Sequence, residues 1–460
     1  MTGLMESGLA SGGIALLLIT VAIALVFEFV NGFHDTANAV ATVIYTNSLR
    51  PGYAVVLSGI LNFCGVFVGG LAVALGIMKL LPADLLMSGG TGGALAMVLA
   101  LLFSAILWNL GTWYLGLPAS SSHTLIGSIL GVGVSYSALN GHFGEGVNWT
   151  KAQDIGVALL VSPLIGAGLA GGLLLLSKLV ISDPRAFAPA PRDTPPPVWI
   201  RALLIFTCGG VSFSHGSNDG QKGVGLVMLI LIGMAPAGFA LDLDAAPSTI
   251  GATIAASQEV EAVIRAHAPT EPVLAELDAL QTVLEGRQRV ADVPPASRFT
   301  VRHAILKADK VLSDLDKKKT LTEAETKALA QAKGAFRLLI DYAPTWVLVA
   351  IATSLGLGTM VGWKRIVVTI GEKIGKSHLS YAQGASAELV AMSTIGMSAW
   401  LGLPVSTTHV LSSGIAGTML AQGSGLQGGT VRNIALAWVL TLPVTMMLSG
   451  GLFAAFWSLT

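Results

Sequence analysis

Charge is scarce in this chain of 460 residues. Its 26 basic and 26 acidic residues make up 11% of the sequence, and the formal net charge is zero. No stripe of Lys and Arg is interleaved with aromatic residues, which excludes a nucleic-acid-binding protein. Cysteine is nearly absent, and Cys64 and Cys208 lack metal-ligand spacing, so we interpret them as small packed side chains. The sequence contains no HExxH, GxSxG or Walker motif of the kind that would indicate an enzyme.

Apolar residues dominate instead. They make up 53% of the chain, and its mean hydropathy is +0.72. A membrane-spanning helix needs about 20 apolar residues. The stretches that qualify are 12–31, 53–80, 93–115, 155–182, 199–211 continued by 224–240, 343–363, 380–401 and 431–459. The start, MTGLMESGLASGG, has no basic residue and no cleavage pattern, so we expect a first span and not a removable signal peptide. The sequence predicts an all-α, multi-pass protein of the cell's inner (plasma) membrane.

One window breaks the apolar pattern. Residues 241–340 hold 27 of the charged residues, with apolar positions at helical spacing and a TLTEAE capping signature. We expect a small soluble helical insertion there. A second break is the proline-rich stretch DPRAFAPAPRDTPPPVW, which cannot continue a helix. The expected organisation is a first membrane repeat (1–182), a linker (183–198), the start of a second repeat (199–240), the insertion (241–340) and the rest of the second repeat (341–460).

Each half shows the same two motifs in the same order. GFHDTANAVAT is followed by GLPASSSHTL, and GSNDGQKGVG is followed by GLPVSTTHVL. Asp35 and Ser120 are 85 positions apart, whereas Asp219 and Ser406 are 187 apart. The difference of 102 is close to the length of the insertion, so the chain is interpreted as a duplication with an insert.

Basic residues near the spans indicate orientation. The linker region and the loop KRIVVTIGEKIGK are basic, but the equivalent first-half loop, PADLLMSGGTGG, has no Lys or Arg. The basic residues are Arg185, Arg192, Arg201, Lys364, Arg365, Lys373 and Lys376. Such a difference predicts two inverted-topology repeats, an arrangement common in alternating-access transporters. If both basic regions are cytoplasmic, the insertion 241–340 is external or periplasmic.

The serine-rich loops are the first candidate site. Gly116 and Pro118 end one helix, and Ser120 then stands at the N-cap of the next, with a matching construction at Ser406. A helix that begins inside a membrane exposes N–H groups that favour an anion. A Pro-kinked helix with Ser and Thr bonded to its own backbone is the alternative for one copy. Two matched copies favour an oxyanion site.

The lone acids are the second candidate site. A carboxylate within a membrane costs about 2.5 to 3.5 kcal/mol on insertion scales, so Asp35 and Asp219 indicate function. Their neighbours differ between the halves: His34 and Asn38 flank Asp35, whereas Asn218 and Lys222 flank Asp219. The alternative is a structural ion pair between Asp219 and Lys222.

Three further side chains accompany these sites. Glu28, two helical turns before Asp35, is a proton-relay candidate or a packing acid. His123 and His409 follow the two hydroxyl clusters, and they either orient the loops by packing or contact substrate and protons.

These motifs resemble the PiT family of inorganic phosphate transporters, in particular its bacterial low-affinity branch. The segments that carry the resemblance are NGFHDTANAVAT, FSHGSNDGQKGVGLVMLILIGMAPAGF, GLPASSSHTLIG and GLPVSTTHVLSS. The resemblance implies inverted repeats with broken helices and re-entrant hairpins, assembled as a homodimer. It also implies import of phosphate together with protons, as a neutral complex with a divalent metal (Mg, Ca, Mn or Zn) that is cargo and not a resident cofactor.

The resemblance also assigns residues. The substrate-binding set is Ser120, Ser121, Ser122, Thr124, Ser406, Thr407, Thr408, Asp35, Asn38, Asn218, Asp219 and Gln221. From the residues themselves, we expect the coupling set to be Asp35, His34, Asp219, Lys222 and Glu28, and we expect Asp35 and Asp219 also to contact the metal.

The chain departs from the sodium-coupled members of the family at two positions. Their pattern resembles Asn-Asp-x-x-Asn in both halves. Here His34 replaces the first Asn of the first half, and Lys222 replaces the last Asn of the second half. A lysine ammonium beside Asp219 can take the space and charge of a sodium ion, so proton coupling is favoured over sodium coupling.

Other functions stay open. Carboxylates accept the proton that phosphate still carries and repel fully ionised sulfate, yet family members with similar motifs carry sulfate, so a sulfate or other oxyanion permease is the alternative. A membrane hydrolase that uses the serines with His123 or His409 lacks a third orienting acid at a recognisable spacing. A channel does not explain paired acids with a lysine. We therefore expect a transporter and no enzyme.

Overall fold

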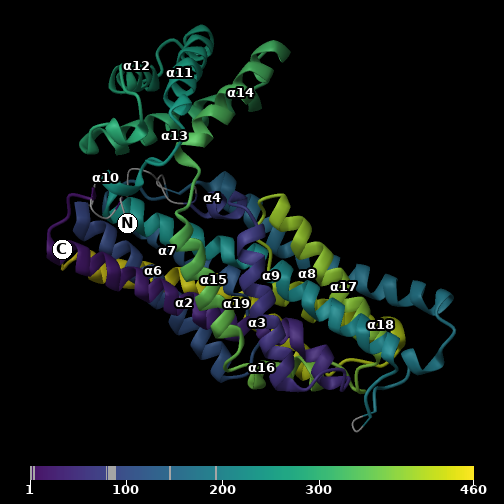
Figure 1. Ribbon diagram of the computed structural model, residues 1–460. Helices are drawn as coiled ribbons and strands as arrows, with labels where there is room; N and C mark the ends of the chain where they lie inside the picture. The colour runs from purple at the N-terminus through teal and green to yellow at the C-terminus, as the bar shows by residue number, and fades with distance from the viewer. Residues whose placement is uncertain are drawn as a thin grey trace. The chain divides into compact units, whose positions relative to one another are not determined.

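The fold is helical throughout the part of the chain that is described. A computed structural model describes residues 3, 6–78, 80, 90–144, 147–191 and 194–459. Within these ranges no strand forms, and six helices are long and apolar enough to cross a membrane, or seven if one bent pair counts as a span. This confirms the prediction of an all-α polytopic membrane fold (Figure 1).

The chain divides into two compact units. The smaller comprises Met1–Ile19 with Met228–Ala343, and the larger comprises Thr20–Val227 with Pro344–Thr460. The first half of the larger unit contains α2 (Ser11–Tyr45), α3 (Pro51–Val68), α4 (Ala72–Met78), α6 (Gly90–Tyr114), α7 (Ser121–Leu139) and α8 (Trp149–Val180). After the short helix η1 (Pro184–Ala186), the second half contains α9 (Val198–Met234), α15 (Thr345–Thr359), α16 (Lys364–Glu372), α17 (Tyr381–Trp400), α18 (Thr407–Gln422) and α19 (Gly428–Trp457).

Helices of the two halves pack crosswise. Helix α7 of the first half lies against α19 of the second, and α8 of the first lies against α18 of the second. Glycine permits both approaches: a Cβ on Gly131 would lie 2.1 Å from the Met446 carbonyl oxygen, and one on Gly417 would lie 2.2 Å from that of Ala167. Each of these pairs joins a helix of one half to a helix of the other, and the two pairs correspond. A duplicated unit is expected to pack in this way. The inverted orientation of the halves remains a prediction.

Helix α9 runs unbroken through residues 212–223, which the sequence had left between two apolar stretches. By contrast, the predicted span 53–80 is interrupted between α3 and α4. Two of the regions used to predict the orientation of the halves are Arg192 and residues 82–89 of the loop PADLLMSGGTGG. Both lie outside the described residues.

Two helical hairpins have the same construction at their tips. Helix α6 ends before Gly116, whose φ is +66°, and α17 ends before Gly402, whose φ is +69°. The next amide in each, at Leu117 and Leu403, donates back to the last helical turn, a glycine C-cap arrangement. Glycine is required at both positions because other L-residues adopt this left-handed conformation at a cost. The chain then reverses into α7 and α18.

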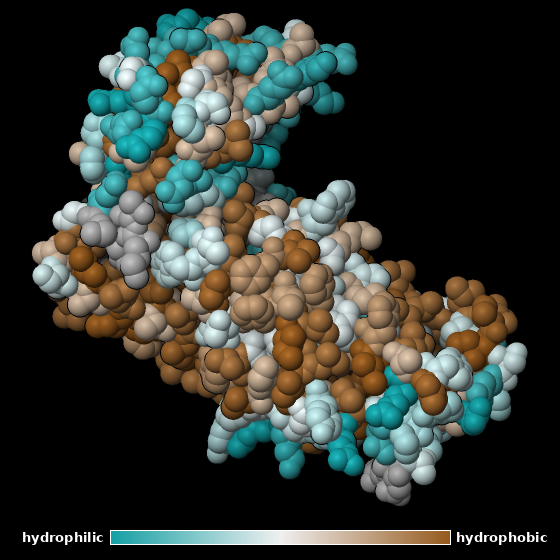
Figure 2. Space-filling view, in the orientation of Figure 1, coloured by the Kyte–Doolittle hydropathy of each residue, from teal (hydrophilic) through white to brown (hydrophobic). Residues whose placement is uncertain are grey.

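Large apolar side chains cover the outside of the larger unit. On α8, Leu160 and Leu164 are each 73% exposed, and Val439 on α19 is 70% exposed. Figure 2 shows this apolar surface over most of the face in view. A large apolar surface of this kind is favourable in contact with lipid and unfavourable in contact with water.

The smaller unit contains the charged insertion. It is formed by α10 (Pro236–Phe239), α11 (Ser248–His267), α12 (Val273–Leu284), η2 (Val290–Asp292), α13 (Pro295–Lys317) and α14 (Glu323–Ile340). Buried aliphatic residues of these helices share one core. Buried Arg298 donates to Glu6 at 2.6 Å and to the Ala237 carbonyl at 2.7 Å, which joins the insertion to the N-terminal segment. The predicted capping signature is confirmed, because Thr322 and Glu325 form a reciprocal capping box.

Candidate functional site

Lys222 connects three parts of the larger unit. Its ammonium donates to Asp219 Oδ1 at 2.7 Å, one turn away on α9, so the ion pair that the sequence offered as the alternative is present. The same nitrogen donates to Ser122 Oγ at 2.5 Å and to the Val405 carbonyl at 3.1 Å. Lys222 and Asp219 are both buried. The lysine therefore contacts the hydroxyl loops of both halves.

Asp35 faces the second hydroxyl loop. Thr408 Oγ1 donates to Asp35 Oδ1 at 2.8 Å, and Thr407 Oγ1 lies 3.3 Å from Oδ2. Asn38, one turn further along α2, donates to Thr408 at 3.0 Å and to Asp35 at 3.3 Å. The acid of the first half thus contacts the loop of the second half, and the lysine of the second half contacts the loop of the first.

His215 lies between the two acids, and the sequence did not assign it a role. Its Nε2 is 3.5 Å from Asp35 Oδ2 and 3.6 Å from Asp219 Oδ2, and its Nδ1 is 2.7 Å from Asn62 Oδ1. The signal that could have found it is its position four residues before Asp219, on the same face of a helix. Its ring bridges α2 and α9 where both acids are buried.

Hydrogen bonds fix the protonated nitrogen of this ring. Thr359 Oγ1 donates to the Leu355 carbonyl and accepts from Asn62 Nδ2, so Asn62 Oδ1 is free to accept from His215. His215 Nδ1 is then a donor, and Nε2 can face the carboxylates favourably only when it also carries a proton.

Both helix starts are capped as predicted. Ser120 is the N-cap of α7 and accepts from the His123 amide at 3.2 Å, and Ser406 is the N-cap of α18 and accepts from the His409 amide at 3.1 Å. Ser122 Oγ donates across to the Val405 carbonyl at 2.9 Å, which joins the two loops directly. The two helix N-termini therefore lie side by side, and each carries the positive end of a helix dipole.

The two loop histidines pack together. The rings of His123 and His409 are 4.6 Å apart, and His409 lies 4.1 Å from Trp438. Trp438 in turn donates to the Pro118 carbonyl at 2.9 Å. This geometry supports the interpretation of packing residues that orient the loops.

Other predicted residues surround this centre. His34 is 3.2 Å from Thr112 on α6, and Asn218 donates to Ser398 on α17 at 3.3 Å, which are matching contacts in the two halves. Thr124 donates to its own helix, to the Ser120 carbonyl at 3.0 Å.

Two further predicted residues contact neighbouring helices. Gln221 accepts from the Val73 amide at 2.8 Å and donates to the Gly69 carbonyl. It therefore bonds to the backbone on both sides of the break between α3 and α4. Glu28 accepts from Asn31 at 3.3 Å and lies against Gly223.

A buried acid that the sequence left out is Glu388 on α17. Thr42 of α2 and Thr207 of α9 both donate to its carboxylate. It lies within the apolar stretch 380–401, where no repeated motif drew attention to it.

Several buried polar atoms at the centre have no hydrogen-bond partner among the described residues. They are Asn38 Oδ1, Ser121 Oγ, Asn218 Oδ1 and Ser412 Oγ. Unpaired buried polar groups are uncommon in proteins and costly. The two serine hydroxyls can donate to an oxyanion near the two helix N-termini, and the two asparagine oxygens can accept only from an oxyanion that still carries a proton.

Comparisons with known proteins agree with this chemistry. The model of the phosphate transporter family matches residues 31–449. The chain is 43% identical to the low-affinity inorganic phosphate transporter PitA of Escherichia coli (strain K12), over 95% of this chain and 96% of the relative. It is 42% identical to PitB of the same strain, with the same coverage.

The likeness extends to a solved structure, titled the sodium-dependent phosphate transporter. It has a TM-score of 0.60 at 19% identity and covers 96% of this chain and 98% of that one, which supports the fold alone. The curated relatives carry the names of transporters, which confirms the prediction that the chain is not an enzyme. On the match of its sequence from residue 31 to residue 449, the chain belongs to the phosphate transporter family.

Proposed function

We propose that this chain imports inorganic phosphate by alternating access between its two repeats, with the low affinity that its Escherichia coli relatives carry in their names. The crosswise contacts support this most directly. Asp35 bonds to Thr408 of the opposite half, and Lys222 bonds to Ser122 of the opposite half. A ligand held at such a junction responds to relative movement of the repeats, as transporter sites commonly do.

The donor and acceptor set suits phosphate. Helix N-termini, hydroxyls and an ammonium attract the anion, and Asp35 or Asp219 can accept the proton that hydrogen phosphate carries. Sulfate carries no such proton, so its contact with the same carboxylates would be repulsive. Transport of sulfate or another oxyanion is the alternative function.

Proton coupling follows from Lys222 and His215. The ammonium of Lys222 neutralises Asp219 where sodium-coupled members of the family would place a cation, which disfavours sodium coupling. The imidazole of His215 touches both acids and can exchange a proton with either. We place the coupled proton in this Asp35–His215–Asp219 cluster, with Glu28 and His34 as candidates for its route.

The cargo is proposed to include a divalent metal. Ligand atoms of Asp35, His215 and Asp219 all lie within 4.8 Å of one another. Carboxylate oxygens suit Mg²⁺, Ca²⁺ and Mn²⁺, and a histidine nitrogen adds Zn²⁺ to the set. A neutral metal–hydrogen phosphate complex also lowers the cost of carrying charge across lipid. We further propose that the protein is a homodimer of the plasma membrane, with the insertion 241–340 on the external face.

Uptake of labelled phosphate into proteoliposomes tests this function. We expect saturable uptake that increases with an inward proton gradient and with magnesium, and that does not respond to sodium. Asp219→Asn and Ser406→Ala should both reduce it strongly, whereas Lys178→Gln, on the exposed end of α8, should not. Sodium-dependent uptake without any response to the pH gradient would exclude the proposed role of Lys222. Preference for sulfate would exclude phosphate as the substrate.

A further inference from the structure

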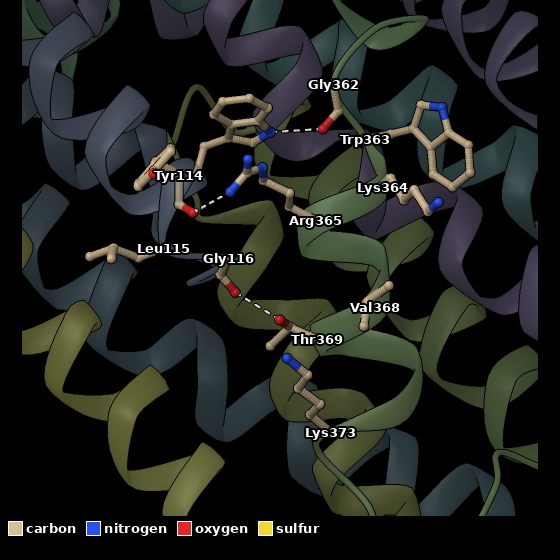
Figure 3. A pocket seen from close by; sticks show the side chains of 11 residues that line it. Tyr114, Leu115, Gly116, Gly362, Trp363, Lys364, Arg365, Val368, Thr369 and Lys373 are labelled. Carbon is tan, nitrogen blue, oxygen red and sulfur yellow. Dashed lines mark hydrogen bonds between the residues drawn. The ribbon is translucent and has the colours of Figure 1, made fainter.

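A surface cavity of about 640 Å³ lies between the end of α6 and helix α16. Figure 3 shows its lining, in which Tyr114 of α6 lies beside Arg365 of α16. Three hydrogen bonds hold the two walls together. They run from Trp113 to the Gly362 carbonyl at 2.7 Å, from Arg365 to the Tyr114 carbonyl at 2.8 Å, and from Thr369 to the Gly116 carbonyl at 2.7 Å. The cavity therefore has a defined shape.

Arg365 is held in position within this cavity. Its guanidinium carbon lies 5.0 Å from the centre of the Trp113 ring and 4.8 Å from that of Tyr114, both within the range of cation–π contacts. Only one of its nitrogens donates to the Tyr114 carbonyl. A guanidinium carries five N–H donors, so further donors of Arg365 remain for an anion.

The lining has an excess of positive charge. Lys364, Arg365 and Lys373 line the cavity, and no acidic residue does. None of the three forms an ion pair with any residue in the described part of the chain. In Figure 3 the ammonium of Lys373 points toward Thr369, on the same side of α16 as the guanidinium of Arg365.

Apolar surface adjoins the charged lining. Tyr114, the last residue of a candidate membrane span, is 66% exposed, and Leu115 after it is 69% exposed. Val361, which precedes Gly362 of the lining, is 52% exposed. Aromatic and basic residues at the end of an apolar helix are typical of the interface between membrane and water, and basic pockets between such helices bind lipid headgroups.

We propose that this cavity is a second anion site, which binds a phosphate group through Arg365 and Lys373. The phosphate belongs either to the headgroup of an anionic phospholipid, whose acyl chains would cover Leu115 and Val361, or to a free phosphate ion. The site shares no residue with the Asp35–Asp219 cluster, so its occupancy can be measured separately from transport.

Native mass spectrometry of the purified full-length protein, titrated with phosphatidylglycerol or phosphatidylcholine, tests the lipid source. Each basic residue near a membrane surface contributes about 1 kcal/mol to binding of anionic lipid, so Lys373→Gln and Arg365→Gln should each weaken phosphatidylglycerol binding about fivefold. Lys178→Gln is the matched control for the general attraction of anionic lipid to a basic residue, because Lys178 is an exposed lysine at the end of another apolar helix, and the cavity variants should weaken binding more than it does. Size-exclusion profiles identify any variant that fails to fold.

Equilibrium dialysis with labelled inorganic phosphate tests the free ion. Loss of one bound phosphate per chain in Lys373→Gln, with no preference for phosphatidylglycerol, would identify free phosphate as the occupant. A preference for phosphatidylglycerol over phosphatidylcholine that both cavity variants abolish would identify the lipid. If neither ligand binds differently to the two variants and to Lys178→Gln, the site does not exist. Loss of transport in Asp219→Asn would not affect any of these results.

Discussion

At the scale of single residues, Lys222 depends on Asp219 more than on any other contact. Their ion pair is buried, and the remaining contacts of the ammonium are to a neutral hydroxyl and a carbonyl. Asp219→Asn should destabilise the protein by about 3–5 kcal/mol, the usual cost of leaving one buried charge unpaired, and should abolish phosphate uptake. Thermal unfolding in detergent and proteoliposome uptake measure the two effects.

The double variant Asp219→Asn/Lys222→Gln is the control for that experiment. It removes both charges, so stability should largely return while uptake stays absent. If Asp219→Asn were as stable as the wild type, the Lys222 ammonium would not depend on its ion pair with Asp219.

His215 makes a separate prediction. Because its ring touches Asp35 and Asp219 together, His215→Gln should reduce uptake by about 100-fold or more, a typical effect of losing a proton-transfer group, and should remove the response to an imposed pH gradient. Uptake with and without the gradient separates this role from a structural one. His142→Gln changes an exposed histidine of the same unit and should leave both values unchanged. A variant that still responds fully to the gradient would rule out His215 as the coupling group.

At the scale of elements, the hairpin tips depend on glycine. Gly402 has a φ of +69°, and an added Cβ would lie 3.0 Å from Ala72 Cβ. Gly402→Ala should therefore cost about 1–2 kcal/mol of stability through the left-handed backbone alone, and should displace the Ser406 N-cap that follows it. Gly429→Ala is the control, since that glycine begins α19 with open space around it. Equal melting temperatures for the two variants would contradict the requirement for glycine at the tip.

The insertion offers a prediction on pH. Hydrogen bonds from the Thr322 backbone, then from His267 and the Thr322 hydroxyl, lower the pKa of Glu325 to about 2. A carboxylate with a depressed pKa stabilises the fold at pH values above its unfolded pKa, and this contribution is lost as pH falls through the folded value. The start of α14 should thus be protected at pH 7 and lose that protection between about pH 4 and pH 2.

Hydrogen exchange of the full-length protein measures this effect. Glu325→Gln should lower the protection of the first turn of α14 at pH 7, and the difference from wild type should vanish near pH 2. A difference that is the same at both pH values would show that the carboxylate charge does not hold the cap.

At the scale of the whole molecule, the repeated motifs determined which features of the site could be predicted from the sequence. Ser120 and Ser406 could be placed at helix starts because each follows the same Gly-Leu-Pro turn, and local chemistry determines such caps. Glu388 could not be placed, since its partners Thr42 and Thr207 come from distant helices. For His215 only the spacing to Asp219 was available, because its other partners, Asp35 and Asn62, lie on different helices. A single sequence does not contain those pairings. The contacts of Gln221 could not be predicted for the same reason, because its amide bonds to a helix break that hydropathy alone did not reveal.

The inverted orientation of the two halves is the remaining whole-molecule prediction. Basic residues flank the linker and α16, whereas the insertion follows α9 and precedes the single helix α15. If the positive-inside tendency holds, position 373 is cytoplasmic and position 297 is external. Lys373→Cys and Ser297→Cys, each in a chain whose Cys64 and Cys208 are replaced by alanine, should react with a membrane-impermeant maleimide from opposite sides.

Right-side-out and inverted vesicles distinguish the two sides. We expect Ser297→Cys to react only in right-side-out vesicles and Lys373→Cys only in inverted ones. A cysteine at position 178, beyond the end of α8, is the control and should follow position 373, because the linker after α8 shares the basic character of the α16 loop. Ser88→Cys, in the first-half loop equivalent to the loop of position 373, should react from the side opposite to position 373. Labelling of positions 88 and 373 from the same side would mean that the halves are parallel. Alternating access would then need a different symmetry, since only antiparallel halves can exchange inward and outward conformations by adopting each other's arrangement.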